Sequence, residues 1–211
     1  MPDPIFPPGC VVAVGLKSEA ALLPPGLRVV ISGGDPARLE ALWPEDATAV
    51  LSFGIAGGLA SGVATGDLLV ASALWDAGEM LTVDPDWQAR LAARCEARPG
   101  LIAASSGLLA TAAAKAALHR VSGALAVDME SGAAARFARS RGLPFAVLRA
   151  VADGPEEGLP EAAAVGLNPD GSPAPWRVMR ALLRRPGELP ALLRLARASA
   201  AAHAALRQAL A

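Results

Sequence analysis

Two apolar runs in the second half of the chain each end in acidic residues. Gly123–Val127 is followed by Asp128–Ser131 (Asp-Met-Glu-Ser), and Leu143–Val151 is followed by Ala and Asp153. Both runs have the length of buried strands, and the stretch between them reads as a helix. This predicts a strand-helix-strand unit with parallel strands. Glu130 and Asp153 would then emerge at one sheet edge, where open α/β sheets hold ligands.

These acids also have a purely structural interpretation. Asp128, Glu130 and Ser131 lie where the helix would begin, and acidic or short polar side chains at that place cap free N–H groups. Asp153 precedes Gly154-Pro155, which is typical of a turn. The residue types alone leave capping and a functional site both open.

Strand patterns alternate with helical patterns along the chain. The expected strands include Cys10–Gly15 and Arg28–Ile31, and the expected helices include 36–42, 85–97 and 112–119. Such alternation predicts an α/β fold with three layers. A length of 211 residues suits one domain covering residues 1–211.

Composition excludes several classes of protein. A net charge of −1 offers no general field for nucleic acid, so no nucleic-acid partner is expected. Two cysteines are too few for a disulfide framework, and two histidines form no cluster with metal-ligand spacing, so no metal site is expected. The opening segment Met1–Pro8 has no basic residue and does not read as a secretory signal. A cytoplasmic location is the simplest expectation.

Four segments together resemble the superfamily of purine nucleoside phosphorylases and methylthioadenosine/adenosylhomocysteine nucleosidases. They are Asp128–Ser131, Arg149–Asp153, the glycine-rich Ser52–Leu59 and the Gly-Asp strand Thr65–Val70. The resemblance runs from Val11 to about Asp153. It implies a nucleoside phosphorylase-like fold, a three-layer αβα sandwich around a central mixed β-sheet, and an enzyme that cleaves N-glycosidic bonds without a cofactor.

The resemblance implies separate roles for the two acids. Asp153 would protonate the departing purine, which leaves poorly as an anion, while the sugar becomes oxocarbenium-like. Glu130 would accept hydrogen bonds from the ribose hydroxyls and stabilise the positive charge. Met129 would pack against the sugar, although ordinary core packing explains a methionine equally well.

Glycines at 54, 57 and 58 are expected in a loop after a strand, where backbone N–H groups can approach a ligand. Ala56 and Gly57 match the part of the motif that lies against the nucleoside or the nucleophile. Two residues depart from the family pattern: Ile55 stands where many members have a small hydroxyl residue, and Ala152 replaces a frequent Ser.

The base loop is expected at residues 105–109, with Ser106 and Leu108 as its candidate contacts. Well-known nucleosidases carry an aromatic residue and a Gly-Asp pair in this loop, and this sequence has neither.

Two segments compete to handle the nucleophile. Glu19 stands where hydrolytic relatives carry a water-activating glutamate, and first-turn helix capping is its alternative role. Inorganic phosphate as a co-substrate could instead bind Gly33, Gly34 and Arg38 at a helix start, although Asp35 is also a good N-cap. Hydrolysis and phosphorolysis both remain open.

A closer resemblance, to hopanoid-associated phosphorylases, rests on Gly107–Lys115 and on the C-terminal segments 165–173 and 181–196. It implies adenosylhopane as the substrate, with adenine leaving. Two other functions stay open: cleavage of a small soluble nucleoside such as methylthioadenosine, and non-catalytic binding of a nucleoside or lipid.

The C-terminal region alternates apolar and basic residues as an amphipathic helix does. Trp176, Met179 and Leu183 interleave with Arg177, Arg180 and Arg184, and such helices can lie on anionic membranes. Packing on the protein's own domain is the more common outcome. We therefore expect a lipid-linked nucleoside as partner, peripheral contact with the inner face of a membrane through this basic helix, and, by resemblance, a homo-oligomer.

Overall fold

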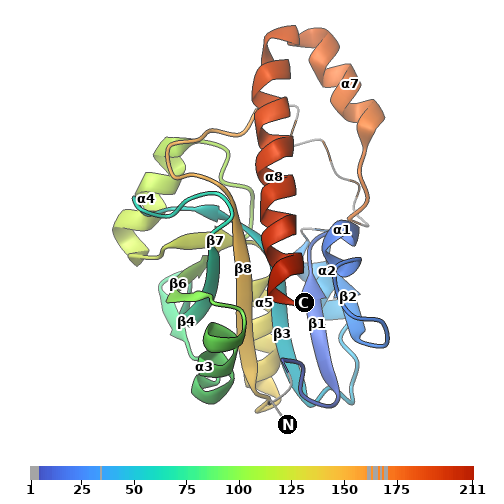
Figure 1. The fold of residues 1–211 in the computed structure, drawn as a ribbon, viewed down its shortest axis with the longest axis vertical. Helices are drawn as coiled ribbons and strands as arrows, with labels where there is room; N and C mark the ends of the chain where they lie inside the picture. Colours follow the sequence, from blue (N-terminus) through green and yellow to red (C-terminus); the bar gives the residue numbers. More distant parts are fainter. Residues whose placement is uncertain (1–4, 34, 161–162, 164–165, 167, 169–170) are drawn as a thin grey trace.

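A computed structural model describes residues 5–33, 35–160, 163, 166, 168 and 171–211. Its centre is an eight-stranded sheet (Figure 1). The strands are β1 Cys10–Val14, β2 Arg28–Ile31, β3 Ala49–Gly58, β4 Leu68–Asp76, β5 Glu79–Leu81, β6 Arg98–Ala104, β7 Ala126–Asp128 and β8 Phe145–Asp153. Five strand pairs are parallel and three are antiparallel, which confirms the mixed sheet.

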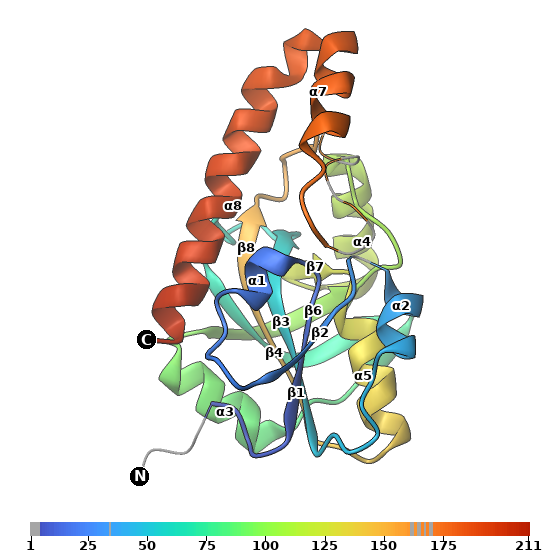
Figure 2. The same cartoon turned by 90° about the vertical axis from the view of Figure 1, so that its right-hand side faces the viewer.

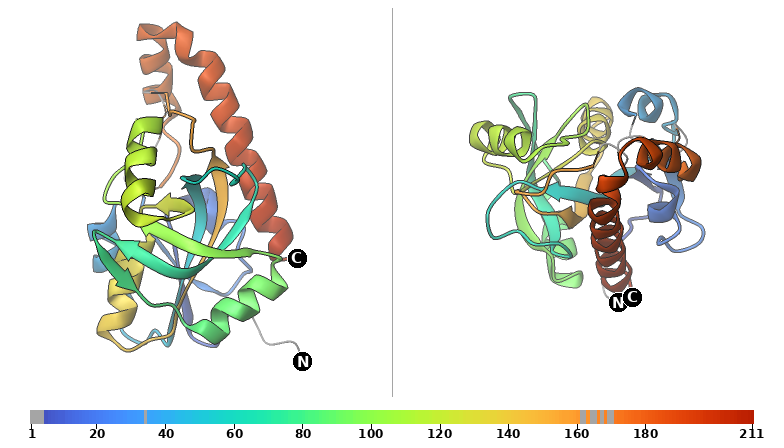
Figure 3. Two further views of the ribbon diagram at one scale, coloured as in Figure 1. Left: turned by 90° about the vertical axis from the view of Figure 1, so that its left-hand side faces the viewer. Right: turned by 90° about the horizontal axis from the view of Figure 1, so that it is seen from above.

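Helices cover both faces of the sheet (Figure 2). On one face α2 Pro36–Ala41 and α5 Ser131–Ser140 contribute to the apolar core. On the other face the core is completed by α1 Lys17–Ala20, α3 Pro85–Arg94 and the second half of α8 Leu189–Ala209. Helix α4 Ala112–Ser122 lies on the opposite side of β8 from α8 (Figure 3). The expected three-layer αβα sandwich is confirmed.

Strand β8 pairs with both β3 and β4, and this closes part of the sheet on itself. The path β3, β8, β4, β6, β7 returns to β3, because β7 also pairs with the end of β3. All nine residues of β8 are buried, as expected for a strand with neighbours on both edges. The last residues of β3, β7 and β8 therefore lie close together.

The expectation that the strands at 123–127 and 143–151 run parallel is wrong. β7 is antiparallel to β3, whereas β8 is parallel to β3, so β7 and β8 run in opposite directions. The reason is the closed path: a simple crossover would place β8 beside β7, but β8 instead pairs with β3 and β4, while β7 pairs with β6 and the end of β3. After β7 the chain consequently runs back toward the level of Gly54 and Arg149, which pair across β3 and β8.

The glycines at 54, 57 and 58 also differ from expectation, because they belong to β3 itself and not to a loop after it. Gly57 pairs with Asp153 of β8 and with Val127 of β7, at a point where the β3–β8 register shifts. A glycine between two strands lets side chains from both of them approach the backbone closely. The glycine signal therefore marks the junction of three strands.

The C-terminal helices confirm the amphipathic pattern at Trp176–Leu183. α7 spans Pro175–Arg184, a short 3₁₀ helix covers 186–188, and α8 follows. α7 and the first half of α8 project beyond the strand ends (Figure 1), and α7 has no fully buried residue. Part of the segment 165–173, on which the hopanoid resemblance partly rests, lies outside the described residues.

Candidate active site

The start of α5 shows which of the acidic residues caps the helix and which does not. The Oδ1 atom of Asp128 accepts hydrogen bonds from the backbone N–H groups of Glu130 at 2.9 Å and Ser131 at 2.7 Å, so Asp128 is the capping acid. Glu130 occupies the N-cap position, but its side chain makes no capping hydrogen bond. Its carboxylate is therefore directed elsewhere, toward the middle of β8.

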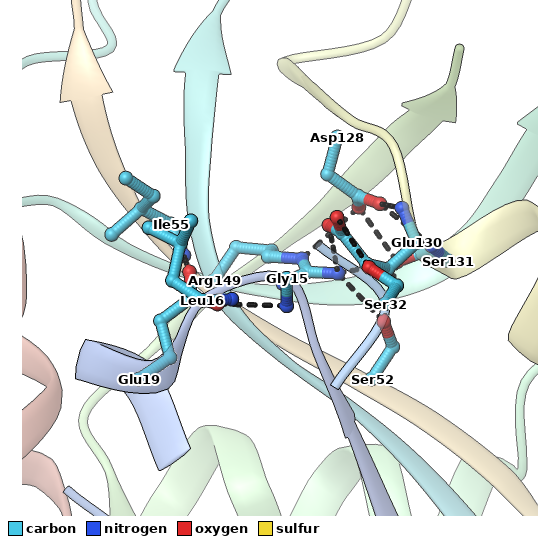
Figure 4. A network of polar contacts seen from close by, with 10 residues as sticks. All are labelled: Gly15, Leu16, Glu19, Ser32, Ser52, Ile55, Asp128, Glu130, Ser131 and Arg149. Atoms are coloured by element: carbon cyan, nitrogen blue, oxygen red, sulfur yellow. Dashed lines mark hydrogen bonds and ion pairs between the residues drawn. The ribbon is translucent and has the colours of Figure 1, made fainter. Parts of the chain in front are cut away.

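That direction leads to Arg149, a fully buried arginine in β8 (Figure 4). Its Nε donates to Asp128 Oδ2 at 3.1 Å, and its Nη2 donates to Ser52 Oγ at 2.6 Å and Ser131 Oγ at 3.2 Å. Nη2 also lies 3.6 Å from Glu130 Oε2. Burial lowers the pKa of Arg149, but the surrounding carboxylates outweigh burial and the pKa lies above its usual value. Arg149 is a permanent cation in this site.

Glu19 approaches Arg149 from the other side, as Figure 4 shows. It is 2% exposed, and three backbone N–H groups hold its carboxylate: Gly15 at 2.9 Å, Leu16 at 2.8 Å and Ile55 at 2.8 Å. The Leu16 bond is the helix-capping interaction that the alternative interpretation expects. The Ile55 bond reaches β3, so Glu19 both caps α1 and belongs to the site.

Burial raises the pKa of all three carboxyl groups considered for chemistry, which are those of Glu19, Glu130 and Asp153. For Glu130 burial is opposed by Arg149 and reinforced by Asp128, and the pKa reaches about 7. The hydroxyl of Ser32 donates to Glu130 Oε1 at 3.3 Å. A carboxyl group with such a pKa changes its charge near neutral pH, which is common at functional sites.

Close packing around this cluster depends on two glycines. A Cβ atom at Gly15 would lie 2.6 Å from Glu130 Oε1. At Gly54, where φ is 151°, a Cβ atom would lie 2.3 Å from Glu19 Oε1 and 2.6 Å from Arg149 Nη1. Nη1 is buried and has no hydrogen-bond partner among the described residues. Together, Arg149 and the carboxylates of Glu19, Asp128 and Glu130 form what we call the arginine cluster.

Asp153 lies apart from the arginine cluster, at the end of β8, and pairs with Lys115 from α4. The Nζ atom of Lys115 donates to Asp153 Oδ2 and, at 2.7 Å, to the carbonyl oxygen of Gly154. The side chain of Lys115 is 1% exposed and that of Asp153 is 10% exposed. Burial raises the pKa of Asp153, while Lys115 opposes this shift. We call these two residues the lysine pair.

The lysine pair lines a small cavity of about 60 Å³ at the junction of β3, β7 and β8. The other lining residues are Gly57, Gly107, Leu108, Leu109, Val127, Asp128, Met129 and Leu159. Met129 and Leu108 therefore line the same cavity as Asp153, and their roles stay predictions. Typical ligand pockets measure roughly 300–1,000 Å³, so this cavity by itself is too small for a nucleoside.

Two candidates for the base and nucleophile loop do not reach this cavity. Ala56 is 4% exposed and belongs to the apolar core, and Ser106 is exposed and is not among the lining residues. It is the neighbouring Ser105 that ties the loop to the site, because its N–H donates to the carbonyl oxygen of Asp128 at 2.9 Å. Gly57 does line the cavity.

The segment considered for phosphate shows capping. The side chain of Asp35 accepts from Ala37 N–H at 2.9 Å at the start of the six-residue helix α2. The N–H of Gly33 donates to Gly15 O at 3.0 Å and is occupied. Gly34 lies outside the described residues, and Arg38 is half-buried on α2. The phosphate role of these residues stays a prediction.

The sequence predicted no role for Arg149, Lys115, Ser32 or Ser52, although Arg149, Lys115 and Ser52 all lie inside the segments that carry the family resemblance. Ser52 and Arg149 are 97 positions apart in the sequence, and Lys115 and Asp153 are 38 apart. A signal did exist for the two cations. Arg149 lies in an apolar run, and Lys115 lies in an alanine-rich helix whose neighbours are mostly uncharged. Buried cations need anionic partners, so each predicts a nearby carboxylate.

A scan against family models places this chain in a defined group. The model described as the phosphorylase superfamily matches residues 36–170, nearly two thirds of the chain. The chain therefore belongs to the phosphorylase superfamily. The match includes both acidic strand ends and Lys115, whereas Glu19, α7 and α8 lie outside it. No curated protein sequence matches the chain.

Solved structures share the fold at low sequence identity. S-adenosylhomocysteine nucleosidase from Streptococcus pyogenes, in complex with 5-methylthiotubericidin, has a TM-score of 0.62 and 24% identity over 68% of this chain and 83% of that chain. A methylthioadenosine/S-adenosylhomocysteine nucleosidase of Helicobacter pylori has a TM-score of 0.60 and 18% identity, with coverages of 70% and 86%. A futalosine hydrolase mutant of Helicobacter pylori has a TM-score of 0.62 and 18% identity, with coverages of 71% and 89%. These matches establish a nucleosidase-type fold.

Proposed function

We propose that the protein cleaves the N-glycosidic bond of a purine nucleoside and releases adenine. The observation that carries this proposal is the position of Asp153. Its buried carboxyl group, whose pKa is raised by burial, lines the same cavity as Met129 in a chain of the phosphorylase superfamily. In the reaction the bond between the anomeric carbon and the purine breaks, its electron pair goes to the purine, and Asp153 delivers a proton to a ring nitrogen.

Glu130 and Met129 would hold the ribose. Among the described residues, Glu130 accepts one weak hydrogen bond, from Ser32 at 3.3 Å, and lies 3.6 Å from Arg149 Nη2, so its oxygens have capacity for sugar hydroxyls. The arginine cluster also contains three carboxyl groups around a single cation, and this excess of acid would stabilise an oxocarbenium-like sugar electrostatically. The expected result for Glu130→Gln is a larger loss on ribosides than on 2′-deoxyribosides, because only ribosides present both hydroxyls.

Water or phosphate would complete the reaction by attacking the anomeric carbon. Glu19 is our candidate to accept the proton of an attacking water, because it is buried and its pKa is raised by burial. For phosphate attack no such base is needed, and Gly33, Gly34 and Arg38 remain the candidate contacts. The two routes give different sugar products.

One experiment tests substrate and nucleophile together. The protein is incubated with adenosine, methylthioadenosine and adenosylhopane, each with and without phosphate, and adenine and the sugar product are detected by mass spectrometry. Adenine release that requires phosphate identifies a phosphorylase, and release without phosphate identifies a nucleosidase. If adenine appears from none of the substrates while equilibrium dialysis detects nucleoside binding, the protein is a binding module and the proposed catalysis is wrong.

We further propose that the natural substrate carries an apolar tail, as adenosylhopane does. Support comes from the resemblance at Gly107–Lys115 and from exposed apolar side chains near the cavity and on α7. Leu108 lines the cavity and is 49% exposed. A substrate preference for adenosylhopane over adenosine is the expected result. Equal kcat/KM for methylthioadenosine would favour the small soluble substrate instead.

A membrane-facing surface on α7 fits such a substrate. Trp176, Met179 and Leu183 are exposed by 74%, 47% and 80% and share one helix face, and arginines flank this face. Exposed apolar residues beside basic ones match a bilayer with anionic headgroups. No described helix is long and apolar enough to cross a membrane. The proposed contact is therefore peripheral.

Liposome flotation tests this surface. Vesicles with anionic lipid should bind the protein at low salt, and the double variant Trp176→Ser, Leu183→Ser should bind much less. Val121→Ser is the matched control, because Val121 is 69% exposed on α4, a helix that lies well apart from α7 (Figure 1). A wild-type protein that stays unbound would rule out the membrane contact. Size-exclusion chromatography with light scattering tests the expected homo-oligomer.

A further inference from the structure

Lys115 is the most deeply buried charged group near the base end of the site. Its side chain is 1% exposed, its ammonium group contacts Asp153 and the Gly154 carbonyl, and it lines the cavity. Burying an ammonium ion is costly, and a buried ion pair is seldom a net gain in stability over apolar residues of the same volume. Stability alone is therefore a weak reason for a lysine at this position.

The pair also raises a chemical question about Asp153. A general acid must carry a proton, but a carboxylate that is paired with an ammonium group has none to give. Burial favours the protonated form of Asp153, and Lys115 favours the ionised form. The proton that the reaction needs is thus held by the two residues together.

We propose that Lys115 is the proton reservoir for Asp153: the ammonium group passes a proton to Asp153 as Asp153 protonates the departing base. This rests on the proposed function. In this step the glycosidic electron pair moves to the base, the ring nitrogen gains the proton of Asp153, and Asp153 regains one from Nζ. Lys115 is left as a neutral amine, and a solvent proton restores the ammonium group after the base leaves.

The geometry suits this relay. Lys115 contacts Oδ2 of Asp153, whereas Oδ1 has no hydrogen-bond partner among the described residues and is the oxygen left for the base. Gly57 packs against this carboxyl group, and a Cβ atom there would lie at ordinary contact distance, 3.5 Å, from both oxygens. The Gly154 carbonyl at 2.7 Å holds the ammonium group in place from the chain segment directly after Asp153. Lys115 is thus a positioning residue that acts through Asp153.

The test compares Lys115→Met, which removes the proton, with Lys115→Arg, which keeps the charge but cannot release a proton in a protein. Arg120→Met is the matched control, because Arg120 is exposed on the same helix. The substrates are adenosine, whose base must be protonated, and p-nitrophenyl riboside, whose leaving group needs no proton. Phosphate is added if the wild type requires it.

Both Lys115 variants should lose about 10²- to 10⁴-fold in kcat/KM on adenosine at alkaline pH. They should lose far less on the nitrophenyl riboside, which also shows that the variants are folded. In Lys115→Met the carboxyl group of Asp153 titrates alone. The kcat/KM of Lys115→Met, divided by that of the wild type, should therefore fall about tenfold per pH unit above the pKa of Asp153. Arg120→Met should follow the wild type.

Three results would overturn the inference. Suppose that Lys115→Met has the pH profile of the wild type and that its loss in kcat/KM is the same on both substrates. Lys115 then has only a structural role, and the proposed function stands. If Lys115→Arg is fully active on adenosine, charge and not proton supply is what matters. If the wild type itself releases no base from any nucleoside, the proposed function fails, and the role of Lys115 fails with it.

Discussion

The arginine cluster and the lysine pair are two buried ionic sites that share strand β8. They differ in the number of carboxyl groups around the cation and in whether the cation can release a proton. In the arginine cluster one permanent cation is surrounded by Glu19, Asp128 and Glu130, and serine hydroxyls and backbone N–H groups complete the contacts. In the lysine pair one carboxylate meets one cation that can release its proton, at the wall of a cavity.

The difference separates two uses of buried acid. Arginine does not release a proton in proteins, so the arginine cluster can only hold charge and orient groups. Lysine and aspartate can share a proton, so the lysine pair can deliver one. In our proposal the arginine cluster acts on the sugar and the nucleophile, and the lysine pair acts on the leaving base. The predictions below test this division, beginning with the largest expected effect.

Asp153→Asn should remove proton delivery while it preserves the shape of the site. We expect turnover of adenosine to fall by about 10² to 10⁴, with the circular dichroism spectrum unchanged. Steady-state kinetics of adenine release measure the effect. A variant as active as the wild type would remove Asp153 from the mechanism and with it the role of the lysine pair.

Arg149→Met should break the arginine cluster. It leaves three buried carboxyl groups without their cation, and removing one partner of a buried ion pair costs about 3–5 kcal/mol in the free energy of unfolding. Urea denaturation measures the loss. Arg139→Met is the control: Arg139 pairs with Glu79, but both side chains are more than half exposed (65% and 56%), and such pairs contribute about 0–1 kcal/mol. Equal losses in the two variants would contradict the central place of Arg149.

Glu130→Gln should change how stability depends on pH. The pKa of Glu130 is raised to about 7, so between its unfolded value of 4.5 and about 7 the folded protein holds a proton that the unfolded chain has lost. Stability contributed by this proton is therefore lost as the pH rises, on the order of 3 kcal/mol in all. The variant lacks this loss, and its free energy of unfolding should fall less between pH 5 and pH 8. Parallel pH curves for the two proteins would refute the shift.

Ser52→Ala should have the smallest effect of the four. The hydroxyl of Ser52 accepts from Arg149 Nη2 at 2.6 Å, and a hydrogen bond to a charged group contributes about 1.5–3 kcal/mol. We expect a loss of about 1.5 kcal/mol, at the low end, because Ser131 Oγ also accepts from the same nitrogen at 3.2 Å. Adenine release should stay close to wild type. A large loss of activity with full stability would move Ser52 into the reaction.

Local signals predicted the elements well. The helix starts at Pro36, Pro85, Ala112 and Ser131 and the strand Arg28–Ile31 agree with the structure, because capping and apolar periodicity are written in a few adjacent residues. The fold class is confirmed for the same reason. The assignment of residues 1–211 to one domain and the chemical roles of the site residues stay predictions.

Tertiary pairing decided what the local signals could not. The direction of β7 relative to β8 depends on β8 lying between β3 and β4. Strands far apart in the chain compete for that place in the sheet, so no local signal predicts it. The same closure brings Arg149 to Ser52 and Lys115 to Asp153. The sequence by itself determined the class of fold, the strand ends that carry Glu130 and Asp153, and the family. Only the tertiary structure decided which cation each acid meets, because that depends on sheet closure and not on spacing along the chain.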